Sequence, residues 1–339
     1  MSFGRNMMMR AVVIILMSLL ALTQVAGAQE VTEYQPPENV EEIAGEISTA
    51  GSSTVAPITE AMIEDFAGVA PDVRISNQIT GTGGGFELFC HGETAIQNAS
   101  RFITQEEIEA CQEAGIDYFV FNVALDGLAI VVNPENDFVE CLTVEQVTQI
   151  WQVDSEVDSW ADVDPSFPDE PIDLYGPDPD SGTFDYMAEV VEDTTGAEGL
   201  RDDYTASVDD NVLVEGVINS PNALAYFGFA YYEQNQDQLK VVEIDNGDGC
   251  VEPNLDTVVG GTYVPFARPL FIYVNADASS EPAVQEFLRF YLANSETVAS
   301  GVGYFPLPES QLAEEQQQLE AAIAGEATPE SQMATPAET

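Results

Sequence analysis

Basic residues are scarce in this chain, which carries 8 Lys+Arg against 60 Asp+Glu and has a formal net charge of −52. Binding to nucleic acid or to an anionic membrane surface requires clustered lysine and arginine. Such clusters are missing, so we expect neither kind of partner. Most of the carboxylates are expected to form a solvated surface, and each of the few arginines needs a specific reason.

Long apolar runs are also missing beyond the first residues, so no membrane-spanning segment is expected downstream. At the start, Arg5 and Arg10 precede an apolar run over residues 11–22, and Ala26-Gly27-Ala28 follows it. This order is typical of a secretory signal peptide, predicted over residues 1–28. The cleavage region contains no cysteine, so we expect no lipid anchor there. The mature protein is predicted to lie in the periplasm or extracytoplasmic space.

Cysteine and histidine are rare, with four cysteines and a single histidine, His91. The chain has no Cys-x-x-Cys pair, so a metal site is disfavoured, and we expect no cofactor. An even number of cysteines in an exported chain favours disulfides. Of the three possible connectivities, we favour Cys90–Cys111, which closes a short loop, together with Cys141–Cys250, which links a long segment.

Strand-like and helix-like segments alternate along the mature chain, which indicates an α/β protein with largely parallel sheets. The predicted strands cover residues 45–51, 73–79, 118–123, 127–133, 172–175, 223–227 and 270–274, and the predicted helices cover residues 55–66, 105–114, 143–151, 184–191, 210–219 and 282–292, with a further helix starting at Phe86. Residues 29–45 are predicted to be an extended linker. Residues 309–339 are rich in Glu, Gln, Ala, Pro and Thr and are predicted to form a disordered tail.

Three junctions between a predicted strand and a predicted helix consist of glycine, serine and threonine: GSSTV at 51–55, GTGGGF at 81–86 and DSGTF at 180–184. In α/β sheets, ligands bind beyond the carboxyl ends of the strands, at helix N-termini. Unpaired N–H groups and a partial positive charge make these N-termini anion sites, for phosphate above all. One such junction is weak evidence, because an ordinary helix cap looks the same. Three together predict an anion-binding protein.

Other motifs fail at single positions. GTGGGF lacks the Lys-Ser/Thr of a P-loop, and Phe86 replaces the third glycine of a dinucleotide fingerprint. DPDSG, at 178–182, resembles the start of an EF-hand loop, but Thr183 stands where that loop needs glycine. A Ser–His–acid triad depends on His91, which lies beside Cys90 and fits a structural role better. We therefore do not expect an enzyme.

Several segments closely resemble the periplasmic phosphate-binding proteins of high-affinity phosphate ABC transporters: AGSSTVAPITEAMIEDF, GTGGGFELFCHGETAIQNASRFI, LTVEQVTQIW, YGPDPDSGTFDYM and NALAYFGFAYY. The resemblance spans about residues 46–306. It implies the two-lobed periplasmic-binding-protein fold (type II), with a hinge of two crossing strands. Lobe 1 is expected over 46–124 plus 262–308, and lobe 2 over 125–261. The implied partners are inorganic phosphate and the permease subunits of an ABC transporter, and the receptor is expected to be a monomer.

The resemblance also implies the phosphate ligands. The family holds phosphate through three turns, and the matching residues here are Ser53 and Thr54, Gly84 and Gly85, and Ser181, Gly182 and Thr183. The sequence departs from the family pattern at two positions. Pro177 stands where an arginine precedes the Ser-Gly-Thr turn, and Arg101 stands where an aspartate follows Ala-Ser.

Arg101 is predicted to supply the cation that other family members provide from the opposite lobe, because a guanidinium meets two phosphate oxygens at once. The alternative is a structural ion pair with a nearby carboxylate. The missing aspartate accepts the proton of hydrogen phosphate and so excludes sulfate. Asp180, or less favourably Asp178, is predicted to take over this role. If neither does, another oxyanion such as sulfate is the alternative ligand. A secreted phosphatase is less favoured, because the chain has no histidine cluster.

Overall fold

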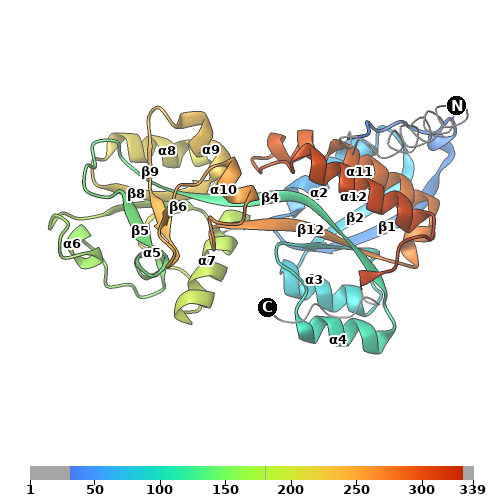
Figure 1. Ribbon diagram of the computed structural model, residues 1–339, viewed down its shortest axis with the longest axis horizontal. Coiled ribbons are helices and arrows are strands. Elements are labelled where there is room, and N and C mark those ends of the chain that lie inside the picture. The colour runs from blue at the N-terminus through green and yellow to red at the C-terminus, as the bar shows by residue number, and fades with distance from the viewer. Residues whose placement is uncertain (1–30, 180, 331–339) are drawn as a thin grey trace, which may run out of the picture. The chain divides into compact units, whose positions relative to one another are not determined.

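The structure is a computed structural model and describes residues 31–179 and 181–330 (Figure 1). The predicted signal peptide and Asp180 lie outside the described residues. Helices alternate with strands along the chain, which confirms the predicted α/β class. Within the described residues, no helix combines the length and the apolar character needed to cross a bilayer.

The helices are η1 (Val40–Glu42), α2 (Ala56–Phe66), α3 (Gly81–Cys90), α4 (Gln105–Ala114), α5 (Val144–Trp151), α6 (Trp160–Val163), α7 (Gly182–Thr195), α8 (Asp210–Asn219), α9 (Phe229–Asn235), α10 (Leu255–Val259), η2 (Ala278–Ser280), α11 (Pro282–Gly301) and α12 (Glu309–Ile323). The strands are β1 (Ala44–Gly51), β2 (Asp72–Ile79), β3 (Ile96–Ala99), β4 (Tyr118–Val132), β5 (Cys141–Thr143), β6 (Asp173–Pro177), β7 (Thr205–Ser207), β8 (Ala223–Gly228), β9 (Lys240–Val241), β10 (Glu243–Asp245), β11 (Cys250–Val251) and β12 (Ala267–Asn275).

Local sequence fixes several of these boundaries. The side chain of Thr104 accepts a hydrogen bond from the backbone N–H of Glu107, and the Glu107 side chain accepts one from Thr104, so α4 begins with a capping box. Gly115 ends the same helix in the left-handed conformation that glycine adopts without strain. The observed bounds of α4 are those predicted from the sequence.

The main sheet has the strand order β2-β1-β3-β12-β4-β8-β6-β7, and β9 also pairs with β4. Strands β1, β2 and β3 are parallel to one another, as are β6, β7 and β8, whereas β12 is antiparallel to both β3 and β4. A smaller sheet has the order β11-β10-β5. Each parallel group therefore presents the carboxyl ends of its strands, followed by helix N-termini, at one sheet edge.

Strands β4 and β12 run side by side and pass from one hydrophobic core to another (Figure 1). Along β4, Ala124 belongs to a core that also contains residues of α2 and α11, whereas Leu125 belongs to a core that contains residues of α5, α7 and α8. At the start of β12 the core changes in the opposite direction, from Phe266 just before the strand to Leu270 within it. Two adjacent strands thus connect two separately packed halves, as expected for a two-lobed binding protein. The sequence had predicted two strands where β4 is one continuous strand.

The described parts of the predicted linker and of the predicted tail pack against the rest of the chain. The predicted linker contains η1, and Tyr34 packs edge to face against Phe290 with 5.3 Å between ring centroids. The prediction of a disordered tail is wrong for α12, which buries Leu312 and Leu319. Its composition is polar, but the few apolar side chains repeat at helical spacing and cover α11 and β4. Residues 331–339 of the predicted tail lie outside the described residues.

Glu315, on α12, is the one acid of this helix whose carboxylate oxygen Oε2 is buried without a hydrogen-bond partner among the described residues. Burial raises the pKa of Glu315 to about 7, although a hydrogen bond from the backbone N–H of Asn122 lowers it. The folded protein therefore binds more protons than the unfolded chain between the ordinary carboxyl pKa and about 7. Stability is lost as the pH rises through this window.

We expect Glu315→Gln to raise the melting temperature by about 2–4 °C at pH 8, where the buried carboxyl of the parent protein is charged. At pH 5 the gain should nearly vanish, because the parent carboxyl is then protonated in the fold. Melting followed by circular dichroism at both pH values measures the effect. Glu314→Gln, an exposed change on the same helix, is the control and should shift the melting temperature by less than about 1 °C. Equal gains at both pH values would contradict the assignment.

Candidate functional site

Two of the three predicted turns meet. Ser53 and Thr54 follow β1 and precede α2, while Ser181, Gly182 and Thr183 form the start of α7. The Thr54 hydroxyl donates to the carbonyl oxygen of Gly182, with 3.3 Å between the oxygens. A Cβ atom placed on Gly182 would lie 2.9 Å from the Cα atom of Thr54. The backbones of the two turns are therefore in contact, although they come from different hydrophobic cores.

This contact brings the N-termini of α2 and α7 together. The Ser181 side chain accepts from the backbone N–H of Thr183 at 3.1 Å, and the Ser52 side chain accepts from the N–H of Thr54 at 3.2 Å. Ser181 thus caps α7, Ser52 holds an N–H group of the turn before α2, and the positive ends of two helix dipoles lie close to each other. Two such ends side by side attract an anion more strongly than either does alone.

Arg268, on β12, points its guanidinium at the same place. Its Nη2 atom donates to the hydroxyl oxygen of Thr54 at 3.0 Å, and its Nη1 atom pairs with the carboxylate of Glu189 on α7. The guanidinium carbon lies 3.6 Å from the ring centroid of Tyr186, which is also on α7. Only 11% of the Arg268 side chain is exposed. A buried cation is thus fixed at the edge of the two turns.

Asp126 compensates the charge of Arg268 from the neighbouring strand. The two residues are directly opposite in the β4–β12 pairing, and their closest charged atoms, Nε and Oδ2, are 3.5 Å apart. Burial raises the pKa of Asp126 to about 6, although the guanidinium of Arg268 lowers it. Among the described residues, neither Nε nor Oδ2 has a hydrogen-bond partner. The pair therefore acts by charge and leaves the Nη groups of Arg268 for other oxygens.

Two carboxylates of α7 accept hydrogen bonds from the donor groups of this site. The Ser53 hydroxyl donates to Oδ2 of Asp185 at 2.5 Å, and Glu189, one helical turn later, pairs with Arg268. Half of the Glu189 side chain is exposed, compared with 4% for Asp126. A hydroxyl and a guanidinium that hold carboxylate oxygens are donors of the kind that also bind oxyanions.

The third predicted turn lies within a helix. α3 begins at Gly81, so the prediction of a helix start at Phe86 is wrong, and Gly84 and Gly85 belong to the first turns of α3. A Cβ atom on Gly85 would lie 2.5 Å from the Cα atom of Gly51, so this glycine allows α3 to pack closely on β1. Close packing of α3 on β1 thus explains why residue 85 is a glycine. The phosphate-binding role of Gly84 and Gly85 stays a prediction.

Arg101 forms an ion pair with Glu107, at the start of α4. Its Nη1 and Nη2 atoms donate to the two carboxylate oxygens at 2.9 and 2.8 Å. These hydrogen bonds raise the pKa of Arg101, against the effect of burial. The structural ion pair considered above is therefore present, and 39% of the Arg101 side chain is exposed. Its role as a phosphate ligand stays a prediction and requires the guanidinium to share or to leave Glu107.

Arg101 also lines a surface pocket of about 430 Å³ between α3 and α4. Gly83 and Phe86 line it from α3, and Glu107 lines it from α4. None of the residues at the contact between the two turns belongs to this pocket. The pocket is therefore separate from the place where the helix N-termini of α2 and α7 meet.

Of the two predicted proton acceptors, Asp178 lies in the described residues, shortly before α7. Asp180 lies outside the described residues. The backbone N–H of Asp178 donates to the carbonyl oxygen of Ser207 at 3.0 Å, and its carbonyl oxygen accepts from the N–H of Ser181 at 2.9 Å. Asp178 therefore shapes the turn that begins α7, and its role as a proton acceptor stays a prediction.

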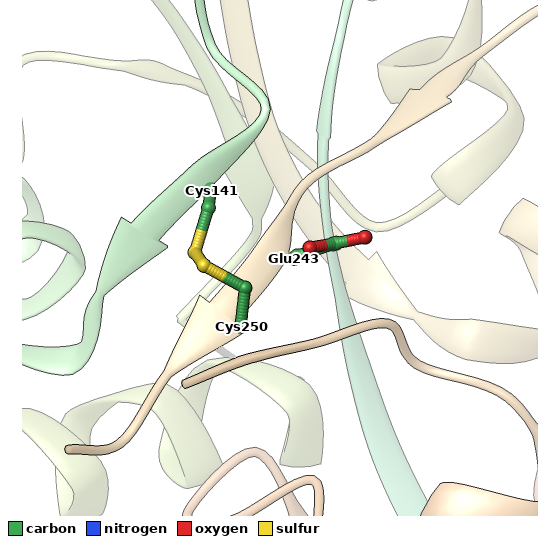
Figure 2. A group of neighbouring side chains, drawn as sticks. All are labelled: Cys141, Glu243 and Cys250. Carbon is green, nitrogen blue, oxygen red and sulfur yellow. A yellow bond between two sulfur atoms is a disulfide. The ribbon is translucent and has the colours of Figure 1, made fainter. Parts of the chain in front are cut away.

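Both predicted disulfides, Cys90–Cys111 and Cys141–Cys250, are confirmed. In the described part of the chain, one group of acidic and cysteine side chains is close enough to consider as metal ligands: Cys141, Cys250 and Glu243. Figure 2 shows that the two sulfur atoms of this group are bonded to each other, beside the carboxylate of Glu243. Metal sites with cysteine use thiolates, so the oxidised pair does not fit one.

Arg268, Asp126, Asp185 and Glu189 were not predicted as site residues. Two of them carry a signal in the sequence. Arg268 is one of the few basic residues of the mature chain, and Asp126 is the only charged residue in the apolar stretch 118–132. Nothing in the sequence indicates that these two residues face each other across adjacent strands. Asp185 and Glu189 resemble ordinary acids on the exposed face of a helix.

Comparison with known proteins agrees with the fold. Residues 36–295 match the PBP superfamily domain. The chain is 48% identical to Protein SphX from Synechocystis sp. over 266 residues, which cover 78% of this chain and 79% of the relative. It is 38% identical to the phosphate-binding protein PstS from Staphylococcus saprophyticus, covering 81% of this chain and 85% of the relative.

A solved structure gives the same result. The crystal structure of a possible phosphate binding protein from Planctomyces limnophilus is 45% identical to this chain and superposes with a TM-score of 0.80, covering 83% of this chain and 99% of that one. The alternation of strands and helices, the two cores joined by β4 and β12, and these matches have one explanation. The chain belongs to the PBP superfamily and, within it, to the PstS-type phosphate-binding proteins.

Proposed function

We propose that this protein captures inorganic phosphate outside the cytoplasmic membrane and delivers it to the permease of an ABC transporter. The supporting observation is the contact between the turn at Ser53 and Thr54 and the turn at Ser181–Thr183, with the buried guanidinium of Arg268 at its edge. The relative from Staphylococcus saprophyticus carries the name of a phosphate-binding protein, and the structure from Planctomyces limnophilus that of a possible one. The chain is a binding protein and not an enzyme, in line with the family to which it belongs.

The donors suit a tetrahedral oxyanion because they converge from three directions. The hydroxyls of Ser53 and Thr54 come from the first turn, and the N-terminus of α7 comes from the second. Arg268 supplies the positive charge that offsets the dianion. Arg101, with Gly84 and Gly85, adds a further set of donors if its guanidinium turns from Glu107 toward the ligand. This dense local set of donors acts at short range, where it outweighs the many screened surface carboxylates.

We infer lobe boundaries near the positions where the two hydrophobic cores change, although Tyr263, Phe266 and Phe305 still pack in the core of lobe 2. Lobe 1 comprises residues 46–124 and 262–308 together with α12, and lobe 2 comprises residues 125–261. The change from Ala124 to Leu125 supports the first boundary. β4 and β12 are the crossing strands of the hinge, and closure of the two turns on phosphate forms the surface that the permease recognises. The mature receptor acts as an exported monomer, without a lipid anchor at the signal-peptide cleavage site.

Isothermal titration calorimetry of the purified mature protein with inorganic phosphate tests this function. We expect one phosphate bound per chain, and a higher melting temperature in excess phosphate, since a ligand at 100 times its Kd stabilises the fold by about 2.7 kcal/mol. Sulfate titrated in the same way and in competition identifies the preferred oxyanion. Absence of both heat and thermal protection with phosphate would reject the proposal. Release of phosphate from an ester would instead support a phosphatase.

A further inference from the structure

Arg268 pairs with two carboxylates that differ greatly in burial. Asp126 is buried and fixed opposite Arg268 in the strand pairing, and it belongs to the wall of the site. Glu189 reaches Arg268 from α7, and half of its side chain is in solvent. Separating Arg268 from Asp126 leaves a buried charge unpaired, which is costly. Glu189 is able to leave at low cost, because its carboxylate becomes hydrated at once.

Glu189 uses the donor that an incoming oxyanion needs. Nη1 of Arg268 pairs with Glu189, while Nη2 donates to the hydroxyl of Thr54, in the turn that contacts Gly182. An anion held between the two turns and bonded to Arg268 therefore competes with Glu189 for the guanidinium. The two anions also repel each other when both are close to the same cation. The geometry favours exchange of one for the other.

Glu189 also influences its surroundings as a charge. It contributes to the electrostatic environment of Arg101, of Asp126 and of Tyr186. Its carboxylate therefore acts by charge on Asp126, on the wall of the site, and also on Arg101 beside α3. The remaining acids near the end of α7, Glu192 and Asp193, are exposed.

We propose that Glu189 is an internal competitor of the ligand: its carboxylate occupies Arg268 in the empty receptor and is displaced when phosphate binds. This proposal rests on the proposed function. The Glu189–Arg268 pair lowers the affinity of the receptor for every oxyanion, because the ligand binds only while the pair is broken. The apparent affinity is the intrinsic affinity multiplied by the fraction of time that the pair is broken. The pair also keeps the guanidinium paired with an anion in the empty site, where a solvated monoanion such as chloride has to break the pair to enter.

The test is calorimetry of the parent protein and of Glu189→Gln with inorganic phosphate, with sulfate as a competitor. We expect Glu189→Gln to bind phosphate about 5-fold more tightly, which corresponds to a pair that is closed roughly four-fifths of the time. The apparent affinity for sulfate should rise by a similar factor, because releasing Arg268 helps any oxyanion. Glu189→Asp keeps the charge but shortens the side chain, and we expect a smaller gain in the same direction.

Glu192→Gln is the matched control, since it removes the same charge from the same helix at an exposed position. It should change phosphate affinity by less than about 2-fold. If Glu192→Gln gives the same gain as Glu189→Gln, the effect is general electrostatics and the proposal is overturned. It is also overturned if Glu189→Gln binds phosphate equally or less tightly while sulfate improves, which would make Glu189 an acceptor of the phosphate proton.

Failure of phosphate binding and failure of the Glu189 competition give different results. If the parent protein binds no phosphate, the proposed function is rejected. If the parent protein binds phosphate and Glu189→Gln and Glu189→Asp gain nothing, the function stands and the competitor is rejected. Circular dichroism melting of each variant without phosphate establishes that it is folded. Should one variant not fold, the other still decides between the outcomes.

Discussion

Replacing Arg268 with alanine is expected to weaken phosphate binding by about 100-fold or more. The guanidinium is almost fully buried and donates to Thr54 at the contact between the two turns. Removing one partner of a buried, hydrogen-bonded charge pair costs about 2–5 kcal/mol of binding free energy, and about 2.7 kcal/mol corresponds to 100-fold. Calorimetry with phosphate on the parent and the variant measures the loss.

The fold should survive this substitution, because Asp126 is able to take up a proton. Its pKa is already raised to about 6 by burial and rises further when the guanidinium is removed. Arg289→Ala is the matched control: this arginine is also ion-paired, with Glu286 and Glu320, but lies on α11. It should leave phosphate affinity within about 2-fold and lower the melting temperature instead. If Arg101→Ala costs far more than Arg268→Ala, the cation that the ligand uses lies beside α3, and our placement of the site is wrong.

Most of the fold could be predicted from the sequence, because the local sequence patterns agree with the tertiary packing. The helix at 105–114 is bounded by a threonine cap and a glycine, and the structure has the same bounds. Disagreements arise where tertiary contacts decide. Gly81–Gly85 look like a loop by propensity, but small residues let α3 pack on β1. α12 looks disordered by composition, yet a few apolar side chains meet a surface that accepts them.

The candidate site could be predicted only in part from the sequence, for a physical reason. Ser53, Thr54 and the Ser181–Thr183 turn are recognisable because strand, turn and helix follow each other in the sequence. Basic residues are rare in this chain, and this rarity makes Arg268 a candidate site residue for the same reason that it makes Arg101 one. What each arginine contacts depends on pairings between residues far apart in the chain. Arg101 meets Glu107 six positions away, whereas Arg268 meets Asp126 and Thr54 across more than a hundred residues.

Gly182→Ala is expected to weaken phosphate binding by about 30-fold without destabilising the empty protein. The added Cβ atom would lie 2.9 Å from the Cα atom and 3.0 Å from the backbone nitrogen of Thr54. These are backbone atoms, so the clash is relieved only by moving the two turns apart. Inserting a methyl group into a close contact costs about 1–3 kcal/mol, and about 2 kcal/mol corresponds to 30-fold in affinity. Calorimetry with phosphate measures this loss.

The same substitution should leave the melting temperature without phosphate unchanged or slightly higher, because the hinge lets the two turns move apart without unfolding either core, and alanine favours a helix more than glycine does. Weaker phosphate binding together with an unchanged melting temperature would show that the substitution affects closure of the two turns and not folding. Gly301→Ala is the matched control: Gly301 also lies in a helix, and a Cβ atom added there meets nothing within 4 Å. It should bind phosphate like the parent. Should Gly182→Ala bind phosphate equally well, the ligand does not depend on contact between the turns of α2 and α7, and the anion lies elsewhere.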